Sequence, residues 1–142
     1  ARLRISSYGM YGFALLTFKT AREGISYNFT LEDSVREMAF SSLQGINLYR
    51  SIQEAVNNAI KHANASRILI EARAQEGRIE VDIRDNGVGF NPNVQASGNG
   101  LGNMSKRMKE IGGQCEIVSE PGKGTVVSLS FAPDGEGAGQ HI

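Results

Sequence analysis

The chain contains little of several residue types and patterns, and each shortage excludes a class of protein. Its single cysteine, Cys115, excludes an internal disulfide and a cysteine metal cluster, and its apolar surroundings favour a buried, inert thiol. Lys plus Arg and Asp plus Glu number 15 each, so no net charge draws the chain to nucleic acid or to an anionic membrane. No apolar run reaches the roughly 20 residues that span a membrane, and no signal-peptide pattern occurs. We therefore expect a globular chain that contacts neither nucleic acid nor membrane.

The length of 142 residues suits one domain with a single core. We expect that domain to cover residues 25–132. Residues 1–24 give no clear pattern beyond a helical stretch at 14–22, and the glycine-rich tail at 133–142 predicts disorder. Because the chain begins with Ala1 rather than Met, we expect it to be a piece of a longer protein.

Apolar residues follow strand and helix periodicities between residues 25 and 131. Strands are predicted at five segments: Ile25 to Leu31, Arg67 to Ala74, Arg78 to Arg84, Glu116 to Ser119 and Thr125 to Phe131. Helices are predicted from Ile46 to Ala63 and from Leu101 to Ile111, whereas 34–43 is ambiguous. Short turns, such as the hairpin signal Glu76-Gly77, join several strands. This order predicts an α/β two-layer sandwich whose mixed, mainly antiparallel sheet has helices on one face.

One face of the first predicted helix carries side chains that suit phosphate chemistry. Glu54, Asn58 and His62 are spaced four residues apart, and Lys61 flanks them. A carboxamide oxygen suits Mg²⁺, a carboxylate beside that metal can act as a general base, and an ammonium can meet a phosphate. A solvated helix face explains the same row more simply, and the helix alone favours that explanation.

Three glycine-bearing stretches follow this helix, at 85–90, 98–102 and 122–125. Asp85 ends a predicted strand, where its carboxylate can accept a hydrogen bond from an exocyclic amine while Gly87 and Gly89 let a flat base approach. The sequence Asp-Asn-Gly is also a strong turn signal without any ligand. The stretch at 98–102 opens a helix, and such an N-terminus can bind phosphate. The stretch at 122–125 lies between two strands, as a simple hairpin turn would.

Two familiar phosphate motifs do not fit these glycines. The Gly-x-Gly-x-Gly spacing at 98–102 follows a long loop, whereas a dinucleotide fingerprint follows a strand and has a different spacing. Gly122-Lys123-Gly124-Thr125 is followed by a strand, whereas a phosphate-binding loop ends in Gly-Lys-Ser/Thr and opens a helix.

Taken in order, these segments resemble the sequence boxes of sensor histidine kinases. Residues 53–63 (Gln-Glu-Ala-Val-Asn-Asn-Ala-Ile-Lys-His-Ala) resemble the N box, and 85–89 (Asp-Asn-Gly-Val-Gly) resemble the G1 box. Residues 98–102 resemble the G2 box, and 122–125 the final glycine box. The form of the N box is similar to that of the nitrate-sensor-like subfamily. The resemblance covers Ile25 to Phe131 and implies the Bergerat ATP-binding fold of gyrase, mismatch-repair ATPases and heat-shock chaperones.

The resemblance implies a role for each matching residue. Asn58 would hold Mg²⁺, Asp85 would bind the adenine amino group, and Thr125 would support Asp85. Glu54 is a candidate general base only. The matching acid activates water in the ATPase relatives, whereas a kinase must not hydrolyse ATP before it transfers the phosphoryl group. The remaining residues implied to contact ATP lie in the N box, the base pocket, and the hinge and phosphate end of the lid: Lys61, His62, Gly87, Gly89, Gly100, Leu101 and Gly102.

The resemblance also implies partners. A catalytic domain of this type binds ATP with Mg²⁺ and transfers the γ-phosphoryl to a histidine on a separate dimerisation domain, from which a response regulator takes it. Residues 1–24 would then be a remnant of that dimerisation domain. The location would be cytoplasmic, whether or not the parent protein is anchored in a membrane. The family's phosphoacceptor segment is missing, since His62 belongs to the N box and His141 to the tail. The phenylalanine-containing box before G2 is also missing, which predicts a short lid.

Three other functions fit the same residues. An anti-sigma-type serine kinase shares the fold and length, although the complete Gly-Lys-Gly-Thr box and Leu101-Gly102-Asn103-Met104 argue against it. A nucleotide-sensing module would bind ATP without transferring it. An ATPase would use Glu54 as base and would release phosphate.

Overall fold

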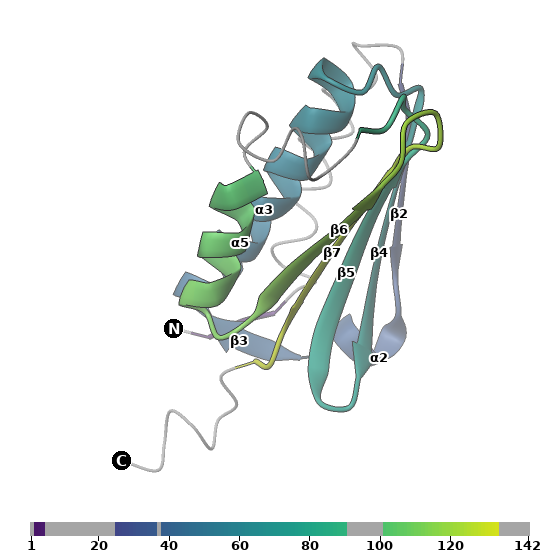
Figure 1. Ribbon diagram of the computed structural model, residues 1–142. Coiled ribbons are helices and arrows are strands. Elements are labelled where there is room, and N and C mark those ends of the chain that lie inside the picture. The colour runs from purple at the N-terminus through teal and green to yellow at the C-terminus, as the bar shows by residue number, and fades with distance from the viewer. Residues whose placement is uncertain (1, 5–24, 37, 91–100, 134–142) are drawn as a thin grey trace.

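Figure 1 shows the computed structural model of the chain, which describes residues 2–4, 25–36, 38–90 and 101–133. The predicted helix at 14–22, the loop before Leu101 and almost all of the predicted tail lie outside these residues. The division into segments 1–24, 25–132 and 133–142 therefore stays a prediction. Within the described residues the chain forms two layers, a twisted sheet and the helices that cover one of its faces.

The described residues form a five-stranded sheet in the order β2-β4-β5-β7-β6. Its strands are β2 (Ser26–Leu31), β4 (Arg67–Gln75), β5 (Arg78–Asp85), β6 (Gln114–Ser119) and β7 (Thr125–Phe131). The pair β2–β4 is parallel, and the other pairs are antiparallel. The predicted mixed, mainly antiparallel sheet is confirmed.

The hairpin between β4 and β5 turns where the sequence predicts it. Glu76 and Gly77 have φ values of 53° and 77°. Two successive positive φ values are typical of the tight hairpin turn whose twist matches that of the strands.

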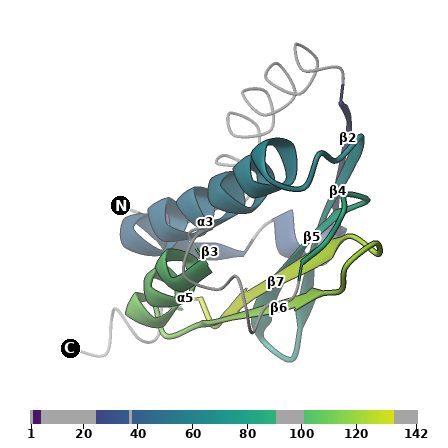
Figure 2. The same ribbon diagram turned by 45° about the horizontal axis from the view of Figure 1, so that its top comes forward.

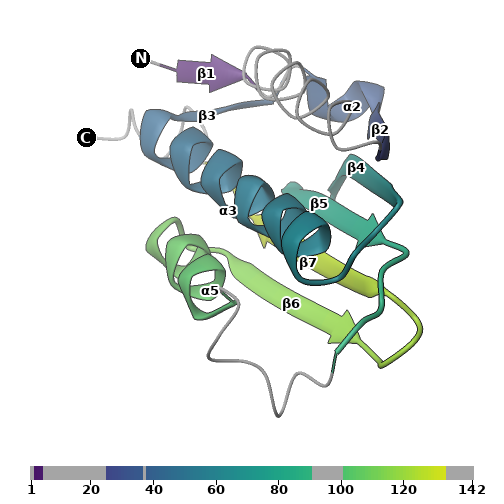
Figure 3. The same ribbon diagram turned by 90° about the horizontal axis from the view of Figure 1, so that it is seen from above.

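The helices α3 (Ser42–Lys61) and α5 (Leu101–Glu110) lie side by side on one face of the sheet, as Figure 3 shows from above. The amide nitrogen Nδ2 of Asn47 joins them, because it donates to the carbonyl oxygen of Arg107 at 2.9 Å and to Oε2 of Glu110 at 3.1 Å. Apolar side chains fill the space between the layers, and Phe40 and Phe131 meet edge to face at 6.0 Å. The largest fully buried side chains include Phe40, Ile68, Ile70, Ile79, Met104, Met108, Leu129 and Phe131.

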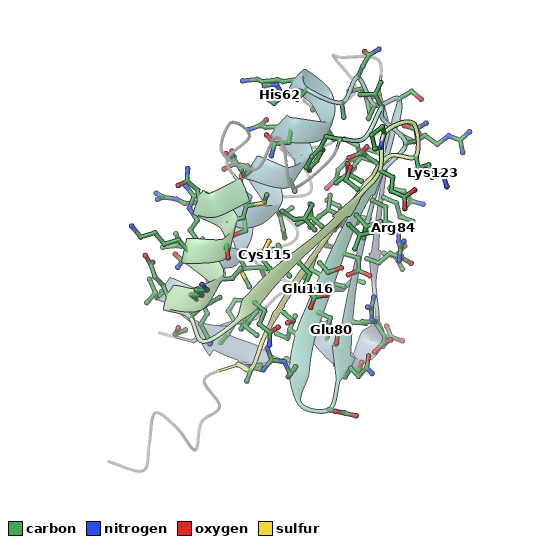
Figure 4. The ribbon with its side chains drawn as sticks, in the orientation of Figure 1. His62, Glu80, Arg84, Cys115, Glu116 and Lys123 are labelled. Atoms are coloured by element: carbon green, nitrogen blue, oxygen red, sulfur yellow. The ribbon has the colours of Figure 1, made fainter. Side chains whose placement is uncertain are left out.

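The other face of the sheet carries charges that pair across neighbouring strands. Arg73 contacts Glu80 at 2.9 Å and Asp82 at 3.1 Å, and Arg84 contacts Asp82 at 3.6 Å. Figure 4 shows Glu80 and Arg84 on this face, away from the helices. Alternation along each strand thus gives the sheet one apolar and one charged face, and it places Asp85 on the same face as Ile83, under α3.

The ambiguous segment at 34–43 contains a short helix, a strand and the start of α3. Helix α2 (Asp33–Arg36) precedes β3 (Ala39–Ser41), and β3 pairs antiparallel with β1 (Arg2–Arg4). Helix α3 begins at Ser42 rather than at Ile46, so the predicted start was four residues late. The Ser41 side chain accepts from the Gln44 backbone N–H, and the Gln44 side chain accepts from the Ser41 backbone N–H. This capping box begins the helix before its apolar repeat does.

We expect Ser41→Ala to lower the free energy of unfolding by about 0.5–2 kcal/mol, because the first turn of α3 loses its side-chain acceptor. Chemical denaturation measures the change. Ser42→Ala, which alters the exposed next residue, is the control. Equal effects of the two substitutions would show that the capping box adds nothing to stability.

Candidate nucleotide site

A pocket opens between α3 and the sheet, where β5 ends and β7 begins. Figures 2 and 3 show α3 crossing the sheet above these strands. Its cavity is only about 40 Å³, well below the roughly 300–1,000 Å³ usual for ligand sites, so among the described residues it is a shallow recess whose mouth is open to solvent. Its lining residues are Ala55, Asn58, Ala59, His62, Ala63, Ile83, Asp85, Gly89, Phe90, Thr125 and Val127. The pocket therefore joins the predicted N-box helix to two of the three glycine stretches.

Asp85 is the half-buried acid of this pocket. Its Oδ1 accepts the backbone N–H of Gly87 at 2.8 Å, and its carboxylate also accepts the backbone N–H of Thr125. Burial raises the pKa of Asp85 above the ordinary value of 3.8, and the two N–H donors partly oppose that rise. The carboxylate is thus held in place as an acceptor that faces the pocket.

The N-box side chains divide into two groups. Asn58 and His62 line the pocket from α3, whereas Glu54 and Lys61 are not among its lining residues. Glu54 is half-buried one turn before Asn58, and Lys61 is exposed in the last turn of the helix. The structure therefore brings Asn58, His62 and Asp85 together at one pocket. Glu54 and Lys61 lie on the same helix but outside the described pocket lining.

The glycines at 87, 89 and 124 are required by close backbone packing. A Cβ on Gly87 would lie 2.4 Å from the carbonyl oxygen of Ala63, and one on Gly89 would lie 2.0 Å from that of Glu120. A Cβ on Gly124 would lie 2.2 Å from the carbonyl oxygen of Asp85. The G1 segment is thus pressed between the end of α3 and the turn before β7, and neither surface leaves room for a side chain.

The predicted lid residues are the least described part of the site. Gly100 lies outside the described residues, Leu101 is the first residue of α5, and Gly102 is exposed in its first turn. The prediction that these three residues form the hinge and phosphate end of a lid stays a prediction.

Sequence reasoning missed several residues around the pocket. Asn86 ties the G1 segment to the loop after α3, since its Oδ1 accepts the backbone N–H groups of Ser66 at 2.9 Å and Arg67 at 2.8 Å. Phe90 lines the pocket, and Ser119 bonds to its backbone N–H. Ile83 and Val127 form the apolar part of the pocket lining on the sheet. Strand alternation could have identified them, because they lie two residues from Asp85 and Thr125 on the same face. No sequence signal marks Ser119.

Cys115 is half-buried on β6, and burial raises the pKa of its thiol to about 11. The thiol therefore stays protonated at neutral pH, in agreement with the prediction that it is not a nucleophile. Among the described residues, no helix is both long and apolar enough to cross a membrane.

The sequence as a whole matches a known family. The model of the "Histidine kinase-, DNA gyrase B-, and HSP90-like ATPase" family matches residues 44–135, which include both walls of the pocket. The chain belongs to this ATPase family. It therefore carries an ATP-binding domain, and its predicted Bergerat-type α/β fold is confirmed.

Curated relatives of the chain include a sensor histidine kinase and a nitrate/nitrite sensor protein. It is 34% identical to the sensor histidine kinase LiaS of Bacillus subtilis over 100 residues, which are 70% of this chain and 28% of that protein. It is 37% identical to the nitrate/nitrite sensor protein NarQ of Escherichia coli over 114 residues, which are 79% of this chain and 20% of that protein. The chain thus spans less than a third of either relative. The resemblance to the ATP-binding domain of sensor histidine kinases is confirmed, and a nitrate/nitrite sensor protein is among the relatives.

Solved structures share the fold at low sequence identity. The catalytic domain of histidine kinase ThkA, in a nucleotide-free form, superposes with a TM-score of 0.75 at 15% identity, over 94% of this chain and 95% of that one. The histidine kinase domain of the blue-light-activated kinase from Erythrobacter litoralis EL346 gives 0.75 at 16% identity, over 93% and 62%. These likenesses show the fold alone.

The packing of Gly124 predicts a difference between two otherwise similar substitutions. Gly124 and Gly122 have φ values of 77° and 82°, but a Cβ on Gly122 would have no neighbour within 4 Å. We expect Gly122→Ala to lower the free energy of unfolding by about 1–2 kcal/mol through backbone strain alone. Gly124→Ala should cost about 1–3 kcal/mol more, because it also pushes on the Asp85 backbone. Denaturant unfolding of both proteins measures the difference, and equal losses would contradict the packing argument.

Proposed function

We propose that this chain is the catalytic domain of a two-component sensor histidine kinase. It binds Mg-ATP and passes the γ-phosphoryl to a histidine on a separate dimerisation domain of the same parent protein, from which a response regulator receives it. The observation that carries the proposal is the joint position of Asn58 and Asp85. They come from α3 and β5 and line one pocket in a chain whose relatives include the sensor histidine kinase LiaS and the nitrate/nitrite sensor protein NarQ.

The base end of the pocket suits adenine. Asp85 offers a fixed carboxylate that can accept from the 6-amino group, and Thr125 lies beside it. Ile83 and Val127 give the flat ring an apolar floor, and Ala59 on α3 leaves space above it. Such a site combines apolar walls with a few fixed polar groups, as ligand pockets usually do.

The phosphate end of the pocket suits a magnesium-bound triphosphate. Asn58 presents a carboxamide, whose oxygen is a neutral, hard ligand of the kind that Mg²⁺ takes together with water and phosphate oxygens. When bound, the metal would neutralise charge that develops on the phosphoryl oxygens. His62 lines the pocket one turn after Asn58, and Lys61 lies next to it. We propose that these two side chains help to position the phosphates.

Transfer to a protein side chain fits the site better than ATP hydrolysis. Glu54, the candidate base, is not among the lining residues of the described pocket. A base that activates water must come within hydrogen-bond reach of it or act through one further water. The alternatives are an anti-sigma-type serine kinase and an ATP-sensing module. A histidine kinase yields an acid-labile phosphoprotein, a serine kinase yields an acid-stable one, and a sensing module yields none.

Asn58→Ala should reduce phosphoryl transfer to a supplied dimerisation domain of the parent protein by at least about tenfold, because the metal loses its ligand from the chain. The label transferred from γ-labelled ATP is counted after separation of the two proteins. Asn57→Ala is the matched control, since Asn57 is the adjacent half-buried residue outside the pocket lining. Undiminished transfer by Asn58→Ala would refute the metal role, and an acid-stable product would indicate a serine kinase.

The raised pKa of Asp85 predicts how ATP binding depends on pH. The ionised carboxylate is a stronger acceptor for the amino group than the protonated carboxyl, so affinity should fall as pH drops through the pKa of Asp85. The loss should begin above the pH at which a free aspartate, with a pKa of 3.8, would protonate. Calorimetric titration of the His62→Gln protein measures the affinity for ATP at each pH, and the substitution removes the imidazole of His62 from the pocket lining. Affinity that stays constant down to pH 4 would contradict the prediction.

A further inference from the structure

The hydroxyl of Ser119 lies behind the base end of the pocket, at the end of β6. Its Oγ accepts the backbone N–H of Phe90 at 2.9 Å, and it lies 3.2 Å from the carbonyl oxygen of Gly124 and 2.7 Å from Oγ1 of Thr125. Ser119 is only 8% exposed, and Thr125 only 7%. Three partners from two segments, Phe90 and the adjacent pair Gly124 and Thr125, therefore meet at one buried oxygen.

The proton count at Ser119 fixes the direction of one of these bonds. A serine hydroxyl has one proton to donate and two lone pairs. The carbonyl of Gly124 can only accept, so it takes the proton, and the N–H of Phe90 occupies one lone pair. The second lone pair then accepts the proton of Thr125. Only this arrangement satisfies all three contacts of a buried hydroxyl, and buried polar groups are rarely left unsatisfied.

This direction determines what Thr125 shows to a ligand. Its only hydroxyl proton points back to Ser119, so its oxygen presents lone pairs to the pocket that it lines. The neighbouring carboxylate of Asp85 is also an acceptor. Among the described lining residues, the polar end of the pocket thus offers acceptors and no hydroxyl donor.

We propose that Ser119 is a specificity-determining residue that acts through Thr125. By holding the Thr125 proton away from the pocket, it makes the pocket favour a 6-aminopurine, which donates, over a 6-oxopurine, which accepts. This inference rests on the proposed binding of ATP. Ser119 does not line the pocket, so its effect on selectivity is transmitted by the direction of one hydrogen bond.

The test compares the dissociation constants of ATP and inosine triphosphate, which differ in the group at position 6 and the proton at N1. In Ser119→Ala the Thr125 hydroxyl loses its acceptor and can turn to donate toward a 6-oxo group. One neutral hydrogen bond is worth about 0.5–1.5 kcal/mol, so the preference for ATP should fall roughly two- to tenfold. Ser119→Thr should keep the wild-type preference. Ser128→Ala, on the opposite face of β7, is the matched control and should leave the preference unchanged.

A double-mutant cycle separates this role from a structural one. In the Thr125→Val background there is no hydroxyl to turn, so Ser119→Ala should no longer alter the preference. A purely structural Ser119 would weaken both nucleotides by the same factor, and that result would overturn the inference while leaving the proposed function intact. Ser119→Cys, which keeps the volume, gives the same readout if the alanine variant does not fold. If the wild-type chain bound neither nucleotide, the proposed function would fail as well.

Discussion

The site depends on the close approach of three backbone segments at one end of the sheet. The G1 segment packs on one side against Ala63, whose carbonyl oxygen accepts the backbone N–H of Val88 at 2.8 Å. On the other side it packs against the turn before β7, with contacts that exclude a Cβ at Gly89 and Gly124. Because backbone atoms cannot move aside as a flexible side chain can, glycine is the only residue that fits there. This packing places Asp85 opposite α3 and thereby forms the pocket.

The same packing gives the apo site an electrostatic cost. The raised pKa of Asp85 means that the folded chain holds the carboxyl proton more tightly than the unfolded chain does. Its contribution to stability is therefore greatest below the unfolded pKa and is lost as pH rises through the folded pKa. When it is ionised, the carboxylate is partly desolvated and has two backbone donors, so a ligand amine that donates to it would offset part of the cost of desolvation. Stability and the proposed nucleotide recognition thus place opposite demands on Asp85.

The parts of the fold that could be predicted from the sequence are those with a local cause. The 76–77 hairpin followed from its turn residues, and the strands followed from alternation. The start of α3 could not be predicted from its apolar repeat, because a capping box at Ser41 begins the helix one turn earlier. The pairing of β3 with β1 joins segments far apart in the sequence, and no local pattern in either short strand reveals it.

The candidate site follows the same division between local and long-range causes. The positions of Asn58 and Asp85 could be predicted because each stands in a motif whose helix or strand sets its direction. The proposed role of Ser119 could not be predicted, because it depends on the register that pairs Ser119 with Thr125 and on the number of protons at one oxygen. A motif identifies the residues that contact a ligand. Whether a hydroxyl among them donates or accepts a hydrogen bond depends on its neighbours on other strands. Adenine selectivity is therefore expected to depend on the β6–β7 register as well as on Asp85 itself, since a shift of one residue would turn Ser119 to the opposite face of the sheet.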